Sequence, residues 1–195
     1  MKKGETKKAF DQNGVIERFK IQLERSGISN TNNVAKPDFS WAIDQNFKIN
    51  EEAYIYIAPF CSPKLQHKVW PYFKELIELL KQKFKNHEIL TAPGPNEIGL
   101  CKDLKLKMIL YKDRPTNINQ LSKIIKQASF VIANDTGPAH LAAHLNVKGL
   151  ALFGNHTSAK KVSIETSNFK VLERGNLEKL APLEVLDSIT RQFST

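Results

Sequence analysis

An aspartate, a threonine, a glycine and a histidine lie together where a short apolar run gives way to a helix-like segment. The stretch reads FVIANDTGPAHLAAHL and contains Asp135, Thr136, Gly137 and His140. Asp and Thr are favoured as caps of free helix N–H groups, and Gly lets a ligand approach the backbone. Because helix N-termini favour anions, a phosphate could rest against Thr136 and Gly137, with His140 facing it. The alternative is a well-capped helix start without a ligand.

Two further segments carry polar residues after predicted strands. In APFCSPKLQHKVWP, residues 58–71, Lys68 precedes a predicted helix and could reach a phosphate across the sheet edge, unless it is simply solvated. In APGPNE, residues 92–97, a glycine turn is followed by Glu97. This carboxylate either accepts from ribose hydroxyls or caps the next helix.

A metal site is not predicted. His140 and His144 are four residues apart, as in a zinc-binding helix, but the intervening Glu of that motif is missing and the sequence indicates no third ligand. His144 is interpreted as a helix-surface or core histidine.

The elements that must position these residues alternate along the chain from Tyr54 onward. Strands are predicted over 54–58, 88–92, 107–110, 130–133 and 149–153, with a sixth over 169–172. Their nearly continuous apolar character indicates a mostly parallel sheet covered by helices on both faces, that is, a doubly wound α/β fold. Such sheets bind ligands beyond the carboxyl ends of their strands, in the loops 59–70, 91–97, 111–117, 134–138 and 154–161.

Helices are predicted between the strands from apolar residues at helical spacing. The first begins at Pro71, a short second is capped by Asn96, a third spans 118–128 and buries Ile118, a fourth begins near Pro138, and a last begins at Pro182. The apolar face of the first consists of Phe73, Leu76, Ile77, Leu80 and Phe84.

Residues 1–49 are predicted to form an arm and linker ahead of a domain over 50–195. The stretch VIERFKIQLERSGI has the apolar stripe of an amphipathic helix and a stop at Gly27. The polar linker SNTNNVAKPD and the hydrophobic arm FSWAIDQNFKI follow.

Composition narrows the functional classes. The 195 residues fit one medium domain, and their apolar runs are far shorter than the roughly 20 residues of a membrane span. Cys61 and Cys101 lack a CxxC spacing, which favours free thiols in a reducing cytosol, and the N-terminus lacks a secretory signal. The net charge of +9 suits an anionic substrate or membrane surface; the lysines form no aromatic-interleaved stripe, so no nucleic-acid partner is predicted.

Taken together, KVWP, APGPNE, NDTGPAHLAAHL and LALFG resemble, in order and spacing, glycosyltransferase family 9, the heptosyltransferases of lipopolysaccharide core assembly. The resemblance covers about residues 14–195. It implies a Rossmann-like C-terminal domain of a GT-B glycosyltransferase, whose substrate is a nucleotide sugar, typically ADP-heptose, with no separate cofactor.

The resemblance also implies roles for individual residues. Lys68 would contact the phosphates or sugar of the donor, Glu97 the ribose hydroxyls and Asp135 the heptose hydroxyls. Thr136, Gly137 and His140 would meet the diphosphate. Two further donor-binding residues are implied: Thr116 in the adenine pocket and Ser62 as a phosphate-binding hydroxyl.

The sequence departs from the family pattern in two places. The family usually has Pro after Phe-Gly, whereas this chain reads FGNHTSAKK. Nothing in residues 1–50 resembles the family's N-terminal domain, which carries the acceptor site and the proposed general base. We therefore expect a cytoplasmic donor-binding half, peripheral at the inner membrane, that meets its lipopolysaccharide acceptor through a missing or separate N-terminal domain. It either works with a separately encoded N-terminal half or is a fragment of a longer gene. The alternatives are a non-catalytic nucleotide-sugar-binding module or degenerate fragment, and a basic nucleic-acid or membrane-surface protein.

Overall fold

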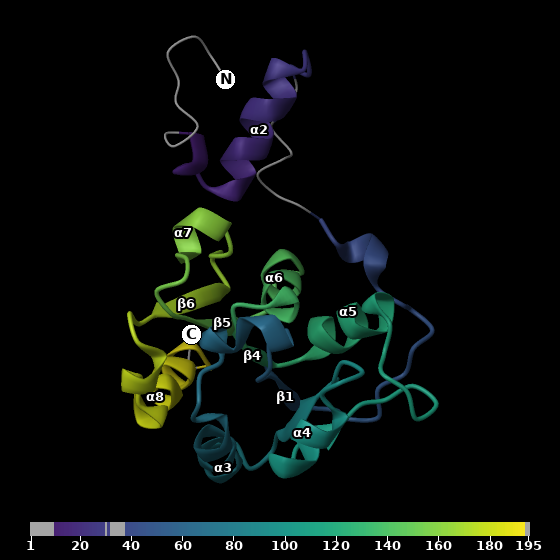
Figure 1. Ribbon diagram of the computed structural model, residues 1–195. Coiled ribbons are helices and arrows are strands. Elements are labelled where there is room, and N and C mark those ends of the chain that lie inside the picture. The colour runs from purple at the N-terminus through teal and green to yellow at the C-terminus, as the bar shows by residue number, and fades with distance from the viewer. Residues whose placement is uncertain (1–9, 30, 32–37, 194–195) are drawn as a thin grey trace.

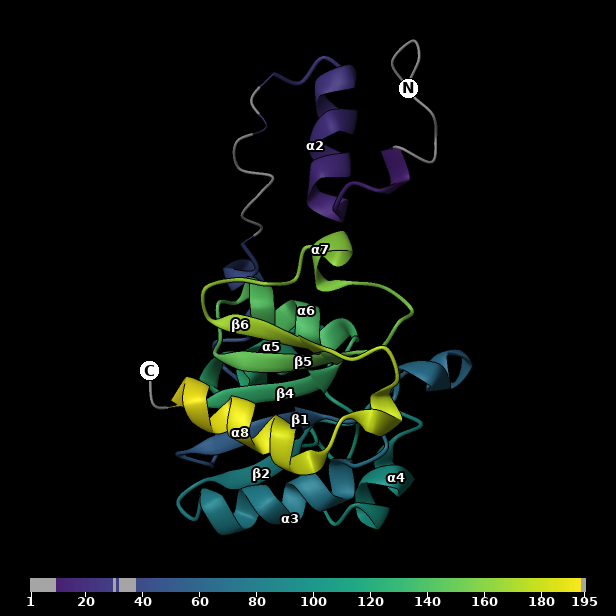
Figure 2. The same ribbon diagram turned by 90° about the vertical axis from the view of Figure 1, so that its left-hand side faces the viewer.

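The computed structural model describes residues 10–29, 31 and 38–193 (Figure 1). The basic N-terminus and most of the predicted linker lie outside the described residues. Helix α2 (Val15–Arg25) is followed by Gly27 with φ of +86°, which confirms the predicted stop. None of the residues of α2 is buried, and the helix lies beyond α7 at the periphery (Figures 1 and 2).

Six strands of the described chain form one fully parallel sheet. They are β1 (Tyr54–Ala58), β2 (Glu88–Thr91), β3 (Lys107–Met108), β4 (Phe130–Asn134), β5 (Gly149–Phe153) and β6 (Phe169–Glu173). Their order is β3-β2-β1-β4-β5-β6. The strands after β1 are added first on one side of it and then, from β4 onward, on the other. The central register pairs Ile55 with Phe130 and Ala58 with Ala133, which brings the carboxyl ends of β1 and β4 to the same edge.

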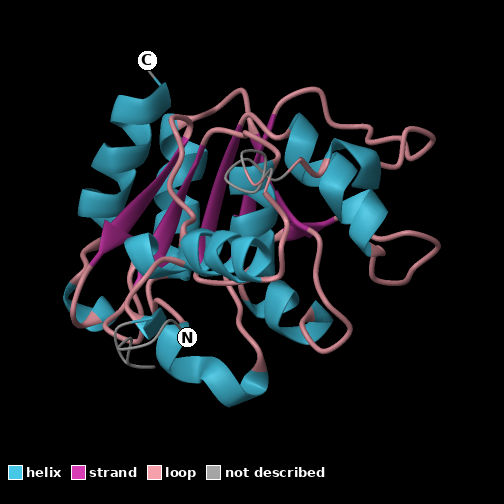
Figure 3. Ribbon diagram, turned by 90° about the horizontal axis from the view of Figure 1, so that it is seen from above, coloured by secondary structure: helices cyan, strands magenta, loops and turns pink. Residues whose placement is uncertain are grey.

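Helices cover both faces of this sheet, as seen from above in Figure 3. They are α3 (Phe73–Lys83), α4 (Ile98–Asp103), α5 (Ile118–Gln127), α6 (Gly137–His144), α7 (Ala159–Val162) and α8 (Pro182–Phe193), together with 3-10 helices at Ser40–Ala42, Pro63–Lys68 and Leu177–Lys179. The predicted doubly wound α/β fold is therefore confirmed.

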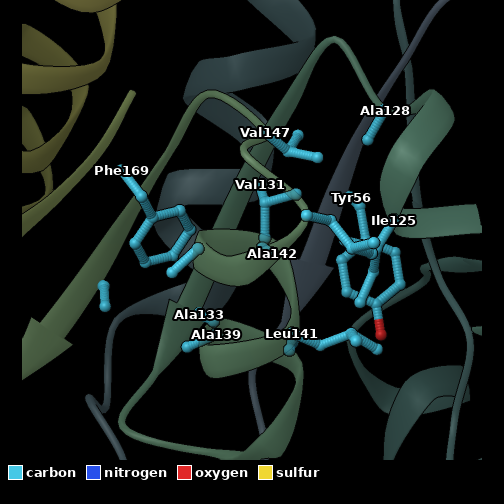
Figure 4. Close-up of a cluster of buried hydrophobic side chains, with 14 of the residues drawn as sticks. Tyr56, Ile125, Ala128, Val131, Ala133, Ala139, Leu141, Ala142, Val147 and Phe169 are labelled. Atoms are coloured by element: carbon cyan, nitrogen blue, oxygen red, sulfur yellow. The ribbon is translucent and has the colours of Figure 1, made fainter. Parts of the chain in front are cut away.

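Alternation along β1 explains the two layers. Ile55 and Ile57 point to the face that packs against α3 and α8. Tyr54 and Tyr56 point to the opposite face, covered by α5 and α6 (Figure 4). Strand side chains alternate between faces, and both sets are fully buried here, so the run YIYIA is apolar throughout. The Tyr54 hydroxyl donates to the backbone oxygen of Ile124 at 2.6 Å, which ties β1 to α5.

Three local predictions were wrong. The strand predicted over 107–110 ends at Met108, because its partner β2 ends at Thr91 and the chain then turns through Pro93. Helix α3 begins at Phe73, two residues after Pro71, which lies in a turn. Ile118 is 60% exposed instead of buried, and it is the first residue of α5.

Candidate functional site

The candidate site lies at the edge of the sheet where the strand order reverses. In a doubly wound sheet the loops after the two central strands run in opposite directions and leave a crevice between them. Here those strands are β1 and β4, which end at Ala58 and Asn134. The loops after them contain the segments singled out in the sequence, so topology brings residues about 70 positions apart together.

Asn134 joins these loops. Its side chain is fully buried, its Oδ1 accepts from the backbone N–H of Trp70 at 3.0 Å, and its Nδ2 donates to the backbone oxygen of Pro59 at 2.7 Å. Trp70 is itself buried and donates from its indole nitrogen to the backbone oxygen of Leu180. The segment that carries Lys68 is therefore fixed at both ends against β4.

Asp135 is the centre of a cluster of cationic and imidazole groups. Its carboxylate is 5% exposed. The Lys68 ammonium donates to Oδ2 at 2.7 Å, and Nε2 of His156 lies 2.8 Å from the same oxygen. Nε2 of His140 lies 3.4 Å from Oδ1. Burial alone would raise the pKa of Asp135, but the hydrogen bonds from His140, Lys68 and His156 outweigh it and hold this pKa well below its usual range.

Neither the carboxylate of Asp135 nor the hydroxyl of Thr136 makes a capping hydrogen bond to α6. Thr136 is the N-cap residue, but its side chain makes no capping bond; its hydroxyl donates to the backbone oxygen of Asn134 instead. Thr136 therefore occupies the predicted cap position, but neither side chain makes the predicted capping bond, because both turn to other partners. The first turn of α6 is left without a side-chain cap, and it begins with Gly137.

Beyond its chain neighbours, nothing crowds Gly137. A Cβ placed on it would meet no heavy atom within 4 Å, and its φ lies outside the left-handed region. The helix N-terminus therefore faces open space at this residue, with backbone N–H dipoles directed outward.

A cavity of about 210 Å³ adjoins the start of α6. Four of the predicted donor-binding residues line it: Ser62, Glu97, Thr136 and Gly137. Oε2 of Glu97 accepts from the backbone N–H of Gly94 at 2.8 Å and so closes the glycine turn. The N-cap of α4 is Glu97, not Asn96 as predicted, and it makes no side-chain capping bond.

Thr116 lies elsewhere. It is half-buried, immediately before Asn117, and does not line this cavity. Asn117 forms a capping box with Gln120 at the start of α5. The placement of Thr116 in an adenine pocket stays a prediction.

Burial favours the thiol form of both cysteines. Burial raises the pKa of the Cys61 thiol to about 11, although Lys68 opposes the effect, and burial raises that of Cys101 to about 12. Since a thiolate is the nucleophilic form of cysteine, Cys61 at the wall of the cavity acts as a small apolar group.

His144 does not join the site. Its ring stacks on Phe39 with 5.6 Å between ring centroids, and burial, helped by the nearby His140, lowers its pKa. Among the described residues, no group of three or more His, Cys, Asp and Glu side chains is arranged to hold a metal ion.

Sequence reasoning missed Asn134 and His156. Both lie within or beside strand-end segments that the sequence indicated, 134–138 and 154–161. The contacts that give them their roles join residues 64 and 21 positions apart, and no local pattern marks such pairs.

Two larger hollows lie away from the strand ends. One, of about 480 Å³, is lined by residues 44–51 and by residues near β3. The other, of about 690 Å³, is an open groove between α3 and the start of α8, with Leu79 and Leu183 in its lining. Neither contains one of the predicted donor-binding residues, so cavity size alone does not select the site.

Sheet order and layering define a Rossmann-like α/β domain. The sequence matches the profile of glycosyltransferase family 9 (heptosyltransferase) over residues 6–186, and the chain belongs to this family. No curated protein matches the sequence.

Solved structures share the fold. The chain is 21% identical to Escherichia coli heptosyltransferase WaaC with ADP, with a TM-score of 0.70 over 88% of this chain and 56% of that one. A family 9 glycosyl transferase from Veillonella parvula is 13% identical, with a TM-score of 0.69 over 94% of this chain and 61% of that one. E. coli ADP-heptose lps heptosyltransferase II is 20% identical, with a TM-score of 0.62 over 80% of this chain and 50% of that one. The chain thus spans between half and about three fifths of these structures.

Proposed function

We propose that the chain binds the nucleotide-sugar donor of a heptosyltransferase, ADP-heptose or a near analogue, with its diphosphate at the start of α6. The observation that carries this proposal is the uncapped N-terminus of α6 at Gly137, with Lys68 and His140 beside it. Backbone N–H groups, a helix dipole and cationic side chains together form an anion site. Related structures support the choice of ligand, since one contains WaaC with ADP and another WaaC with ADP-2-deoxy-2-fluoro heptose.

The remaining residues take complementary roles in this proposal. Ser62, Thr136 and Glu97 line the cavity beside the helix start. In this proposal the hydroxyls of Ser62 and Thr136 serve the phosphates, and the carboxylate of Glu97 accepts from ribose hydroxyls. The hydrogen bonds from Lys68, His140 and His156 keep the pKa of Asp135 well below its usual range, so we assign it no role as a base. It is an ionised hydrogen-bond acceptor for sugar hydroxyls.

In the proposed transfer, an acceptor hydroxyl attacks the anomeric carbon of the heptose and loses its proton to a base. The bond from that carbon to the phosphate oxygen breaks, and the nucleoside diphosphate leaves. Lys68, His140 and the α6 N-terminus stabilise the charge that develops on the leaving phosphate. The acceptor would be a lipopolysaccharide core at the inner membrane, and the base would come from an acceptor-binding half. Among the described residues, no helix is long and apolar enough to cross a membrane.

An alternative is a module that binds the nucleotide sugar without transferring it. No described residue before β1 lines the cavity at the strand ends, so the site offers a donor but no identified acceptor. Donor binding alone does not separate the two functions; transfer of labelled heptose to a core acceptor does.

The experiment that tests the proposal is calorimetric titration with ADP, UDP, GDP and ADP-heptose. Binding of the adenine ligands in preference to UDP and GDP supports it. Binding of none of the four would reject a donor site in this chain.

Gly137→Ala tests whether the diphosphate lies at the start of α6. The space around Gly137 is open apart from its chain neighbours, but a Cβ on the residue before Pro138 disfavours helical backbone, so unfolding should become slightly easier. A methyl group at the helix start would also obstruct the diphosphate, and we expect ADP affinity to fall about 10-fold or more, since this lost contact is of the order of 1.4 kcal/mol.

Gly99→Ala in α4 is the matched control, because its Cβ would also meet nothing within 4 Å. Denaturant unfolding measures the change in stability of each variant, and titration with ADP should show a loss for Gly137→Ala alone. Unchanged ADP affinity in Gly137→Ala would place the diphosphate elsewhere.

Lys68→Met should weaken ADP and ADP-heptose alike, by about 10-fold at low salt, because a charge-assisted bond to phosphate is lost. The loss should shrink as salt rises, since screening weakens such bonds. Lys64→Met, from the same 3-10 helix but exposed, is the control. If both variants have the same affinity for ADP, Lys68 does not bind the phosphates and has a structural role.

A further inference from the structure

The ring of His156 is largely buried and has one polar partner among the described residues. It follows β5 in the loop that departs from the family pattern, and its side chain is 9% exposed. The ring stacks on Phe153, with 6.0 Å between centroids, and the edge of His67 lies against it at 5.7 Å. These contacts fix the ring so that Nε2 lies 2.8 Å from Oδ2 of Asp135.

The position of the ring determines which nitrogen carries hydrogen. An ionised carboxylate can only accept, so Nε2 of His156 must donate to Asp135. Nδ1 is buried and has no hydrogen-bond partner among the described residues. It lies against Gly154, where a Cβ would come within 3.3 Å of it. The bond to Asp135 is thus the one hydrogen bond of this side chain among the described residues.

The three groups around Asp135 differ in their access to solvent. The side chain of His140 is 34% exposed and that of Lys68 is 20% exposed, whereas that of His156 lies behind the carboxylate at 9%. An anion arriving at the start of α6 can draw Lys68 and His140 toward itself. It cannot draw His156, whose ring is held between Phe153 and His67.

We propose that His156 is a positioning residue that keeps Oδ2 of Asp135 bound while Lys68 and His140 turn to the donor's diphosphate. The carboxylate then stays in one orientation, with Oδ1 free for the hydroxyls of the sugar. Without His156, a ligand that recruits Lys68 would release the same carboxylate that must hold its sugar. This inference rests on the proposed function, but its first test needs no ligand.

That first test is the protonation of the His156 ring in the ligand-free protein. Long-range ¹H–¹⁵N NMR spectra assigned with a His156→Gln sample distinguish a protonated from an unprotonated Nε2. The proposal requires hydrogen on Nε2 at neutral pH. An unprotonated Nε2 would overturn it whatever the chain binds.

The second test compares His156→Phe with His156→Gln in titrations with ADP and ADP-heptose. Phenylalanine keeps the stacked ring but has no donor, whereas glutamine can place an N–H near the position of Nε2. We expect His156→Phe to lower ADP-heptose affinity about 10-fold and ADP affinity less than about 3-fold, with His156→Gln restoring most of the loss, as for a bond to a charged group. Thermal unfolding of both variants shows whether they fold, and His156→Met replaces the Phe variant if that one does not.

The outcomes separate the two proposals. A wild-type chain that binds neither ligand defeats the proposed function, and the NMR spectrum still decides the bond between His156 and Asp135. If the wild type binds both ligands, the result for His156→Phe decides the positioning role. Equal losses of ADP and ADP-heptose affinity, or no loss of either, would reject that role and leave the proposed function standing. Failure of glutamine to restore binding that phenylalanine lost would also reject it.

Discussion

Asp135→Asn should weaken ADP-heptose binding about 10- to 100-fold, the loss expected for one or two hydrogen bonds to a charged acceptor. The same variant should bind ADP as well as the wild type or slightly better. In the wild type the Lys68 ammonium donates to the carboxylate of Asp135 at 2.7 Å. Replacing the carboxylate by an uncharged amide leaves the ammonium free to bind phosphate. It also takes a negative charge away from the start of α6.

Opposite effects on the two ligands make this variant informative. Asparagine keeps the size of the side chain, so little repacking is needed around a group that is 5% exposed. Isothermal titration with each ligand at fixed salt gives the two affinities. Equal losses for ADP and ADP-heptose would mean that Asp135 supports the whole site and does not bind the sugar.

The difference between the predicted and observed fold follows from the range of the interactions involved. Strands such as YIYIA and GLALF could be predicted because every residue in them is buried, which requires an uninterrupted apolar run. Strand β3 was predicted too long, because its length depends on where β2 ends. Ile118 was predicted to be buried from its spacing alone, but spacing does not show how far the sheet extends beneath a helix.

The candidate site divides in the same way. The sequence placed Asp135, Gly137 and Lys68 at the strand ends, because each follows or adjoins an apolar run. It could not show that the carboxylate of Asp135 faces three side chains instead of the helix N-terminus. Those partners lie 67, 5 and 21 positions away, and only the shortest of these separations falls within one motif.

Asn134→Ala should produce the largest loss of stability among the variants considered, about 2–6 kcal/mol in the free energy of unfolding. Two buried backbone groups, the N–H of Trp70 and the oxygen of Pro59, would lose their partner. A buried polar group left unsatisfied costs about 1–3 kcal/mol, and the costs of two such groups combine. Denaturant unfolding followed by tryptophan fluorescence measures the change, because Trp70 lies in the affected contact.

Asn176→Ala provides the comparison, since Asn176 is exposed and its side chain accepts only a local capping bond from the N–H of Glu178. Loss of a cap costs about 1 kcal/mol. A similar small loss in Asn134→Ala would mean that water replaces the missing amide. A large loss with unchanged affinity for ADP would show that Asn134 holds the loops together without setting the position of Lys68. If stability and ADP affinity fall together, the amide that joins β4 to the loop after β1 also aligns the anion site.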